Sequence, residues 1–148
     1  MIIEETIIVE VPMDIVMQIM GDVRSIPAWA TVEGTISNVQ GVGAAMQYDW
    51  QFTVGELQFR GHSKVTEQTT DTLITETTGD IASLWTINLT PLGKQTMLRV
   101  VVEYLPLNPF FEVLADKVIH QLATPAVAEE NIKRFKELVE ERAQVLVR

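Results

Sequence analysis

The stretch that decides the fold is SLWTINLTPLGKQTMLRVVVEYL, residues 83–105. Apolar and polar residues alternate over 83–90 and again over 96–105, and successive side chains of a β-strand point to opposite faces. The residues between the two runs, PLGK, are typical of a tight turn. Two strands joined by a short turn are most simply antiparallel. The stretch therefore predicts a hairpin whose apolar face consists of Trp85, Ile87, Leu89, Leu98, Val100, Val102 and Tyr104.

The same alternation extends towards the start of the chain. It predicts strands at residues 3–11, 35–40, 45–53, 57–67, 72–78, 83–90 and 96–105. A helix is expected at 14–20, and a second short helix or turn at 23–30. From Pro109 to about Gln144 the apolar residues recur at helical spacing, and Thr124-Pro125 is expected to kink or interrupt this helix.

The predicted order is thus one strand, two short helices, six strands and a long C-terminal helix. A sheet that is apolar on one face needs a cover, and the amphipathic C-terminal helix supplies one. The fold class is therefore α+β. With 148 residues, no internal repeat and no linker, residues 1–148 are expected to form a single domain.

Composition excludes several classes of function. The net charge of −9 argues against a partner made of nucleic acid and against docking on an anionic membrane surface. The absence of cysteine excludes disulfides, thiolate catalysis and zinc–thiolate sites. No apolar run approaches the ~18 residues of a spanning helix, so no stable membrane insertion is expected. Glu4 and Glu5 stand where a signal peptide would carry positive charge, which favours a cytoplasmic protein.

Large aromatic residues gather on the predicted inward faces of the strands. The segment MQYDWQF, residues 46–52, places Tyr48 and Trp50 on one face and Asp49 on the outward face. Both core packing and the wall of a pocket account for such a stripe. Buried Tyr and Trp need partners for their polar groups, whereas a pure core more often uses Phe and Leu, so the stripe favours a pocket.

Three motifs carry a family resemblance: Gly41-Val42-Gly43 before the third strand, LTPLG at 89–93, and a long helix containing FKELVEE at 135–141. With the element order, they resemble the START-like (SRPBCC) superfamily over the whole chain, and most closely its polyketide cyclase/dehydrase and lipid-transport branch. The resemblance implies the helix-grip fold, a curved seven-stranded antiparallel sheet wrapped around the C-terminal helix. It also implies a hydrophobic cavity between them that opens near the two short helices.

The expected partner is a small hydrophobic ligand in this cavity. Tyr48, Tyr104 and Asn131 are candidates to orient it, and the segment LPLNPFF at 105–111 is a candidate for the cavity mouth together with Trp29 and the Pro27 turn. The predicted ligand-binding residues are Trp29, Tyr48, Trp50, Phe59, Trp85, Tyr104, Leu114, Val118, Leu122 and Asn131.

Residues for catalysis or metal binding are few. Glu112, Asp116 and His120 are spaced by four, but the helical pattern turns them to the solvent side, and His62 shares an outward strand face with polar neighbours. The sequence therefore predicts no metal site and no cofactor. Glu5 is the one carboxylate on an inward strand face, and a buried acid or base would have to be a Glu, Asp or Tyr with a shifted pKa.

Three functions stay open. The leading hypothesis is binding or transport of a lipid, isoprenoid, polyketide or aromatic ligand. The second is a polyketide cyclase/dehydratase-type enzyme that uses the same cavity, because members of the superfamily include both carriers and cyclases. The third is a co-chaperone-like interaction module, which predicts an exposed apolar patch. Ligand identity and oligomeric state are left open by the sequence.

Overall fold

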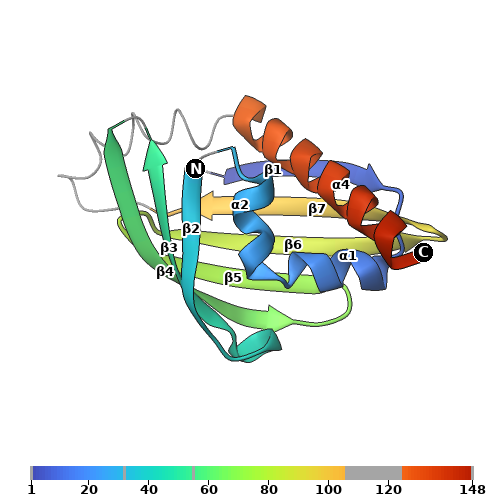
Figure 1. The fold of residues 1–148 in the computed structure, drawn as a ribbon, viewed down its shortest axis with the longest axis horizontal. Helices are drawn as coiled ribbons and strands as arrows, with labels where there is room; N and C mark the ends of the chain where they lie inside the picture. The colour runs from blue at the N-terminus through green and yellow to red at the C-terminus, as the bar shows by residue number, and fades with distance from the viewer. Residues whose placement is uncertain (1, 32, 55, 106–124, 148) are drawn as a thin grey trace.

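The computed structural model describes residues 2–31, 33–54, 56–105 and 125–147. Figure 1 shows the chain as a sheet with helices on one of its faces. In chain order the elements are β1 (Ile2–Val9), α1 (Met13–Met20), η1 (Val23–Ser25), α2 (Ile26–Trp29), β2 (Glu33–Gln40), η2 (Gly43–Ala45), β3 (Gln47–Val54), β4 (Leu57–Gln68), β5 (Thr72–Gly79), β6 (Ser83–Leu92), β7 (Gln95–Tyr104) and α4 (Pro125–Val147).

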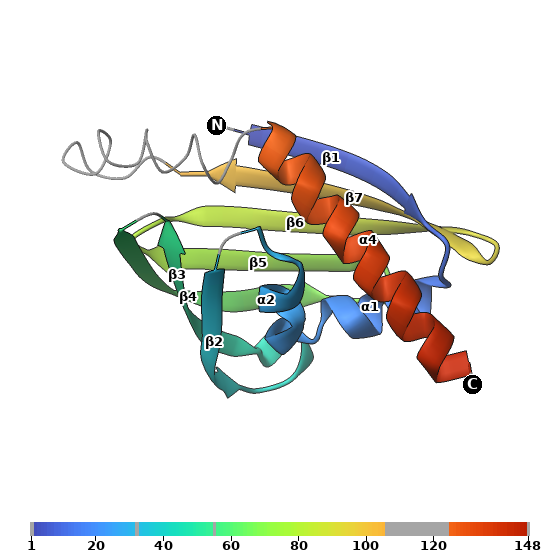
Figure 2. The same cartoon turned by 45° about the horizontal axis from the view of Figure 1, so that its top comes forward.

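The seven strands form one curved antiparallel sheet in the order β1-β7-β6-β5-β4-β3-β2. β1 and β2 follow one another in the chain but form opposite edges of the sheet, and α1 and α2 connect them. Figures 1 and 2 both place α1, α2 and α4 on the same face, with α4 crossing over the β1 side. The predicted helix-grip fold is confirmed.

The β6–β7 hairpin has a tighter turn than predicted. Leu92 pairs with Gln95, so the turn consists of residues 93–94, and Gly93 has the positive φ of 67° that such a turn requires. The sequence placed Pro91 in the turn, but it lies in β6. β5 begins with Thr72 opposite Asn88, so β6 has one neighbouring strand at Pro91, and the missing backbone N–H breaks no ladder hydrogen bond.

Other boundaries differ from the prediction by a few residues. β1 ends at Val9 instead of Val11, and beyond its end the carbonyl oxygen of Val11 accepts a hydrogen bond from the Thr96 hydroxyl at 2.7 Å. α4 extends to Val147 instead of Gln144. The predicted helix at 109–124, its break at Thr124 and most of the 105–111 segment lie outside the described residues. None of the described helices is long and apolar enough to cross a membrane.

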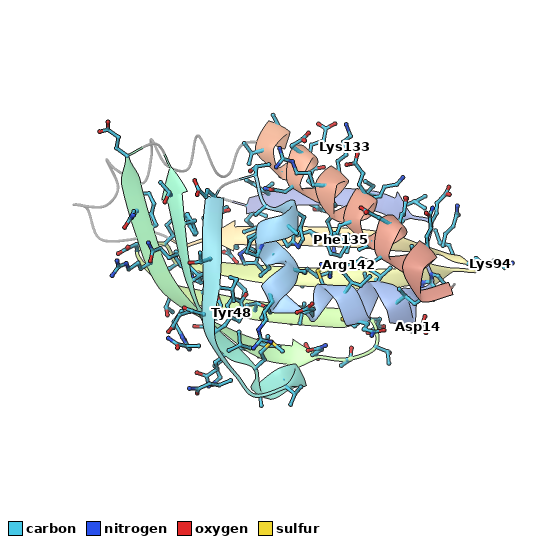
Figure 3. All side chains as sticks on the ribbon, viewed as in Figure 1. Asp14, Tyr48, Lys94, Lys133, Phe135 and Arg142 are labelled. Atoms are coloured by element: carbon cyan, nitrogen blue, oxygen red, sulfur yellow. The ribbon has the colours of Figure 1, made fainter. Side chains whose placement is uncertain are left out.

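The larger part of the core lies where α1 and α4 cover the sheet. α4 buries Ile132, Phe135 and Val139, which recur at the spacing of one helix face. Figure 3 shows Phe135 directed from α4 towards the sheet and Lys133 directed away from it. Among the residues that the structure describes, the largest fully buried side chains are Phe135, Leu98, Val9, Val11, Val16, Val139 and Thr96.

A second buried cluster centres on β3. Trp50 stacks on Phe52 with ring centroids 4.7 Å apart and an interplanar angle of 15°. Its indole lies directly over Gly61 of β4, where a side-chain Cβ would come closer than 3.0 Å to the ring. The buried members of this cluster are Val23, Tyr48, Trp50 and Ile81. The cavity described next is bounded by both clusters.

Candidate functional site

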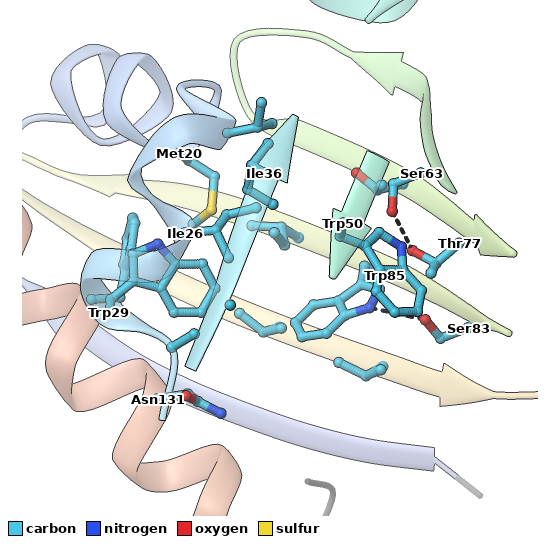
Figure 4. Close-up of a pocket in the computed structure, with 18 of the residues that line it drawn as sticks. Met20, Ile26, Trp29, Ile36, Trp50, Ser63, Thr77, Ser83, Trp85 and Asn131 are labelled. Atoms are coloured by element: carbon cyan, nitrogen blue, oxygen red, sulfur yellow. Dashed lines mark hydrogen bonds between the residues drawn. The ribbon is translucent and has the colours of Figure 1, made fainter. Parts of the chain in front are cut away.

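A cavity of about 280 Å³ lies between the inner face of the sheet and the helices. Its size falls just below the usual range of roughly 300–1,000 Å³ for small-molecule sites. All seven strands contribute side chains, and Figure 4 shows part of the lining. The helical segments contribute Met20, Val23, Ile26, Pro27, Trp29, Ala128, Asn131, Ile132 and Phe135.

Five hydroxyl-bearing residues cross the cavity wall in one line, which we call the hydroxyl row. The strand register pairs Tyr48 with Ser63, Ser63 with Thr77, Thr77 with Ser83, and Ser83 with Tyr104. The row therefore runs directly across β3, β4, β5, β6 and β7. All five residues line the cavity. Side chains directly opposite on one sheet face are neighbours, so the row sets five hydroxyl-bearing residues side by side on a largely apolar wall.

Hydrogen bonds hold much of this band in place. Ser63 Oγ and Thr77 Oγ1 lie 2.8 Å apart, and the Trp85 Nε1–H donates to Ser83 Oγ at 3.1 Å; Figure 4 shows both bonds. Burial raises the pKa of Tyr48, and a hydrogen bond with Ser63 offsets part of that rise. These bonds satisfy polar groups that burial would otherwise leave without partners.

Tyr104 ends the row at β7 beside the cavity. Burial raises the pKa of Tyr104 to about 12, because a tyrosinate in this apolar surrounding would lose its hydration. Both tyrosines of the hydroxyl row are consequently neutral near pH 7. A neutral phenol donates and accepts hydrogen bonds but does not abstract protons.

The helical side of the cavity is held together by aromatic packing and one hydrogen bond. The Trp29 ring meets Phe135 edge to face, with centroids 5.7 Å apart and an interplanar angle of 81°. The backbone N–H of Thr31 donates to Asn131 Oδ1 at 2.8 Å, which fastens the segment after α2 to α4. Asn131 thus lines the cavity while its side-chain oxygen already has a partner in the chain.

Most of the predicted site residues come together here. The cavity lining includes Trp29, Tyr48, Trp50, Trp85, Tyr104 and Asn131. Phe59 does not line it: the residue packs against Phe52 with ring centroids 5.9 Å apart, and Phe52 stands at the cavity in its place. Leu114, Val118 and Leu122 lie outside the described residues.

Three members of the hydroxyl row were not predicted from the sequence: Ser63, Thr77 and Ser83. A signal was present for Ser63, because it follows Phe59 on the inward face at a spacing of four and precedes Val65 by two. A small polar residue at an inward position between apolar ones marks a buried group that needs a partner. The alignment of the three strands that makes the row follows from register, which the alternation alone leaves undetermined.

The outward face of β3 and β4 carries a separate polar group. His62 Nδ1 lies 2.8 Å from Asp49 Oδ1, and Asn38 Nδ2 donates to Asp49 Oδ2 at 2.7 Å. The hydrogen bonds from Asn38 and His62 lower the pKa of Asp49. Asp49 and His62 are about half exposed, as expected for the solvent side of the sheet. Glu112, Asp116 and His120 lie outside the described residues.

The cavity offers little charge to a ligand. Glu5 is the one charged residue among the described residues that line it, and no Lys, Arg or His is among them. Within the described ranges, no group of three or more His, Asp or Glu side chains is arranged to hold a metal ion. The chemistry available at the described lining is therefore apolar contact, hydrogen bonding by neutral groups and the single carboxyl group of Glu5.

Comparison with known proteins places this geometry in a family. The family model described as polyketide cyclase / dehydrase and lipid transport matches residues 1–140. A search of curated proteins finds no match to the sequence.

Solved structures share the fold at low sequence identity. The Thermus thermophilus protein TTHA0849 superimposes with a TM-score of 0.78 at 19% identity, covering 97% of this chain and 99% of that one. The Zhui aromatase/cyclase of a Streptomyces species gives 0.74 at 12% identity, covering 96% and 94%. The Chromobacterium violaceum protein CV1439 gives 0.67 at 18% identity, covering 95% and 98%. At these identities the likeness establishes the fold alone.

Proposed function

The chain belongs to the polyketide cyclase / dehydrase and lipid transport family, and we propose that this member binds or carries a small hydrophobic ligand in the cavity between the sheet and α4. The ligand would be a lipid, isoprenoid, polyketide or aromatic molecule. The observation that carries the proposal is the cavity of about 280 Å³, whose described lining is mostly apolar and aromatic and includes a single charged residue.

Binding in such a cavity would be driven by removal of apolar ligand surface from water. That transfer contributes roughly 25 cal/mol per Å² before the costs of association are subtracted. The wall is already formed and fixed by the Trp29–Phe135 contact and the hydrogen bond between Thr31 and Asn131, so little ordering is required on binding.

The proposal is tested on the purified protein. Native mass spectrometry would detect a co-purified ligand, and displacement of a lipophilic fluorescent dye would report binding of added apolar compounds. We expect saturable dye binding with one dye per chain. Absence of both a bound ligand and saturable dye binding would refute the proposal.

Two neighbouring positions on α4 provide a matched pair of variants. Ala128 lines the cavity, whereas Glu129 is exposed on the solvent side of the same helix turn. Ala128→Trp places an indole in the ligand space and is expected to lower dye affinity by about tenfold or more, because it removes volume from a cavity that is already small. Glu129→Trp adds the same side chain outside and should leave affinity unchanged. Equal affinities in the two variants would place the dye elsewhere.

An enzyme of the cyclase/dehydratase type is the second candidate, and the position of Glu5 favours it. That reading requires an ionisable group beside the cavity, and Glu5, Tyr48 and Tyr104 all line it. The raised pKa values of the two tyrosines limit them to hydrogen bonding near neutral pH, so Glu5 is the described lining residue left for general base work. Turnover of a polyketide-like substrate that Glu5→Gln abolishes, with dye binding intact, would favour the enzyme.

The interaction-module hypothesis has less support. A protein of that kind is expected to carry a large exposed apolar patch. On the outward face of β1 the exposed Ile2 and Ile8 are separated by Glu4 and Thr6, and Glu4 forms an ion pair with Arg99 at 2.6 Å. Exposed apolar residues interrupted by charged and polar ones are usual for a monomer surface.

A further inference from the structure

One buried polar atom beside the cavity has no partner. Trp50 lines the cavity and is 7% exposed, and its Nε1 is the one buried side-chain nitrogen or oxygen without a hydrogen bond in the described part of the chain. Trp85, a partly buried indole that also lines the cavity, donates its Nε1–H to Ser83. A buried donor left without an acceptor costs considerably more than the net gain of an ordinary hydrogen bond, so native proteins rarely leave one.

The indole of Trp50 cannot turn outwards to find water. It is stacked on Phe52 at 4.7 Å and lies over Gly61, where the absence of a side chain makes room for the ring. An acceptor must therefore come to the indole. Figure 4 shows Trp50, Ser63 and Thr77 on one side of the cavity and Trp29 and Asn131 on the other.

Trp50, which carries the unpartnered donor, and the hydroxyl row lie at the same end of the cavity. Tyr48, which begins the row, precedes Trp50 by two residues on the same face of β3, and the row continues through Ser63 and Thr77. A ligand atom placed there would meet N–H and O–H groups. The opposite end, formed by Trp29, Phe135 and neighbouring apolar side chains, presents hydrocarbon and aromatic surface.

We propose that Trp50 Nε1 and the hydroxyl row anchor the oxygen of a carbonyl-type acceptor at the buried end of a neutral, otherwise apolar ligand. Indole N–H is a donor only, so its complement must be an acceptor. The described lining contains no cation to neutralise a carboxylate, and it contains the carboxylate of Glu5, so an anionic end is disfavoured. The inference rests on the proposed binding function and adds which chemical class of ligand the cavity selects.

The experiment compares two probes of nearly equal shape, fluorene and fluorenone, which differ by one carbonyl oxygen. Affinities of both are measured by dye displacement for the wild type and for Trp50→Phe, which keeps an aromatic ring but removes the donor. The preference for the ketone over the hydrocarbon is expected to fall about tenfold in Trp50→Phe, because the carbonyl oxygen loses its buried donor. Trp50→Phe also changes the cavity volume, but this change affects the affinities for fluorenone and fluorene alike and cancels in their ratio.

Nuclear magnetic resonance on the unaltered protein supplies a readout that does not depend on the variant. We expect fluorenone to move the Trp50 indole proton to the lower field typical of a hydrogen bond, while fluorene does not. Trp85 is an internal reference, because its indole is already bonded to Ser83. A carboxylate of fluorene is expected to bind more weakly than fluorenone.

Each other result has a defined meaning. If both probes bind with a ratio that Trp50→Phe leaves unchanged, or the Trp50 indole proton already resonates at the bonded position and stays there, the inference is wrong and the binding function stands. If the carboxylate binds most tightly, the assignment of a neutral ligand end is wrong. If neither fluorene nor fluorenone binds, and no dye binds either, the proposed function fails and the inference falls with it.

Discussion

Replacing Gly61 by alanine is expected to destabilise the protein, although the same change elsewhere in a strand does the reverse. Alanine in a strand or helix interior ordinarily gains roughly 0.5–1 kcal/mol over glycine because it restricts the unfolded chain. At Gly61 the added Cβ would come closer than 3.0 Å to two ring atoms of Trp50 and to the carbonyl oxygen of Thr78. Gly61 has no positive φ, so the expected cost arises from this steric conflict.

The size of the effect follows from what must move. A buried aromatic side chain covers about 150–250 Å², so shifting the Trp50 indole until half of it is exposed costs about 2.5 kcal/mol. The Thr78 oxygen belongs to the backbone of β5 and moves only if the strand moves, which adds an overpacking cost of about 1–3 kcal/mol. After the entropy gain of about 0.5–1 kcal/mol is subtracted, Gly61→Ala should lower the free energy of unfolding by about 2.5–5 kcal/mol.

Urea unfolding followed by far-ultraviolet circular dichroism measures this loss without depending on tryptophan fluorescence. Gly21→Ala is the matched control: Gly21 has a helical φ of −74°, and the nearest atom to its added Cβ is the flexible end of Gln68. Its effect should stay within about 0.5 kcal/mol. In a Trp50→Leu background the cost of Gly61→Ala should fall by at least about 1 kcal/mol. An unchanged cost, or a stabilised Gly61→Ala protein, would refute the packing of Trp50 on Gly61.

Three further predictions follow from the core and the site. Phe135→Ala should lower the free energy of unfolding by about 3–5 kcal/mol in urea titrations, because the ring is 2% exposed. Tyr48 and Tyr104 are the only tyrosines of the sequence, and the pKa of each is raised above the ordinary tyrosine value of 10. The native protein should therefore show little tyrosinate absorbance at pH 10. As pH rises above 10, the unfolded chain releases the Tyr104 proton before the folded protein does. Burial of the neutral Tyr104 therefore stabilises the fold fully below pH 10, and about 3 kcal/mol of unfolding free energy is lost as pH rises towards 12. Tyr104→Phe should make the free energy of unfolding fall less steeply over this range. Asn131→Ala removes the acceptor of the Thr31 N–H, so amide exchange at Thr31 should accelerate, by about fivefold for a loss of about 1 kcal/mol.

Alternation of side chains was sufficient to predict the strands and the face on which each residue lies. Trp50, Trp85 and Tyr104 were therefore assigned correctly to the inner face. Period-two patterns do not give the position of a residue along the curved sheet. This is why Phe59 was placed in the site, although its partner on β3, Phe52, lines the cavity and Phe59 does not.

Features that depend on pairing between strands could not be predicted from the sequence. The hydroxyl row exists because Ser63, Thr77 and Ser83 are in register, and a shift of one residue in β4 or β5 would turn those side chains to the other face. The unpartnered Trp50 nitrogen likewise depends on three-dimensional packing. The two-residue turn at 93–94 was missed because proline is a strong turn signal. Pro91 is tolerated within β6 because the pairing of β6 with β5 stops at Asn88, which the sequence pattern does not show.

The pairing of β1 with β7 has a consequence for how the chain folds during synthesis. Every other pair of neighbouring strands is consecutive in the sequence, whereas the partners of β1 follow it by roughly ninety to one hundred residues. At ribosomal rates of about 5–20 residues per second, β1 waits about 5–20 s for its partner. During that interval its isoleucine-rich segment has no partner strand, so its backbone N–H and C=O groups stay unpaired. β1, which supplies Ile3 and Glu5 to the cavity wall, can dock only after β7 has emerged, so a ligand selects the finished chain and cannot guide its early folding.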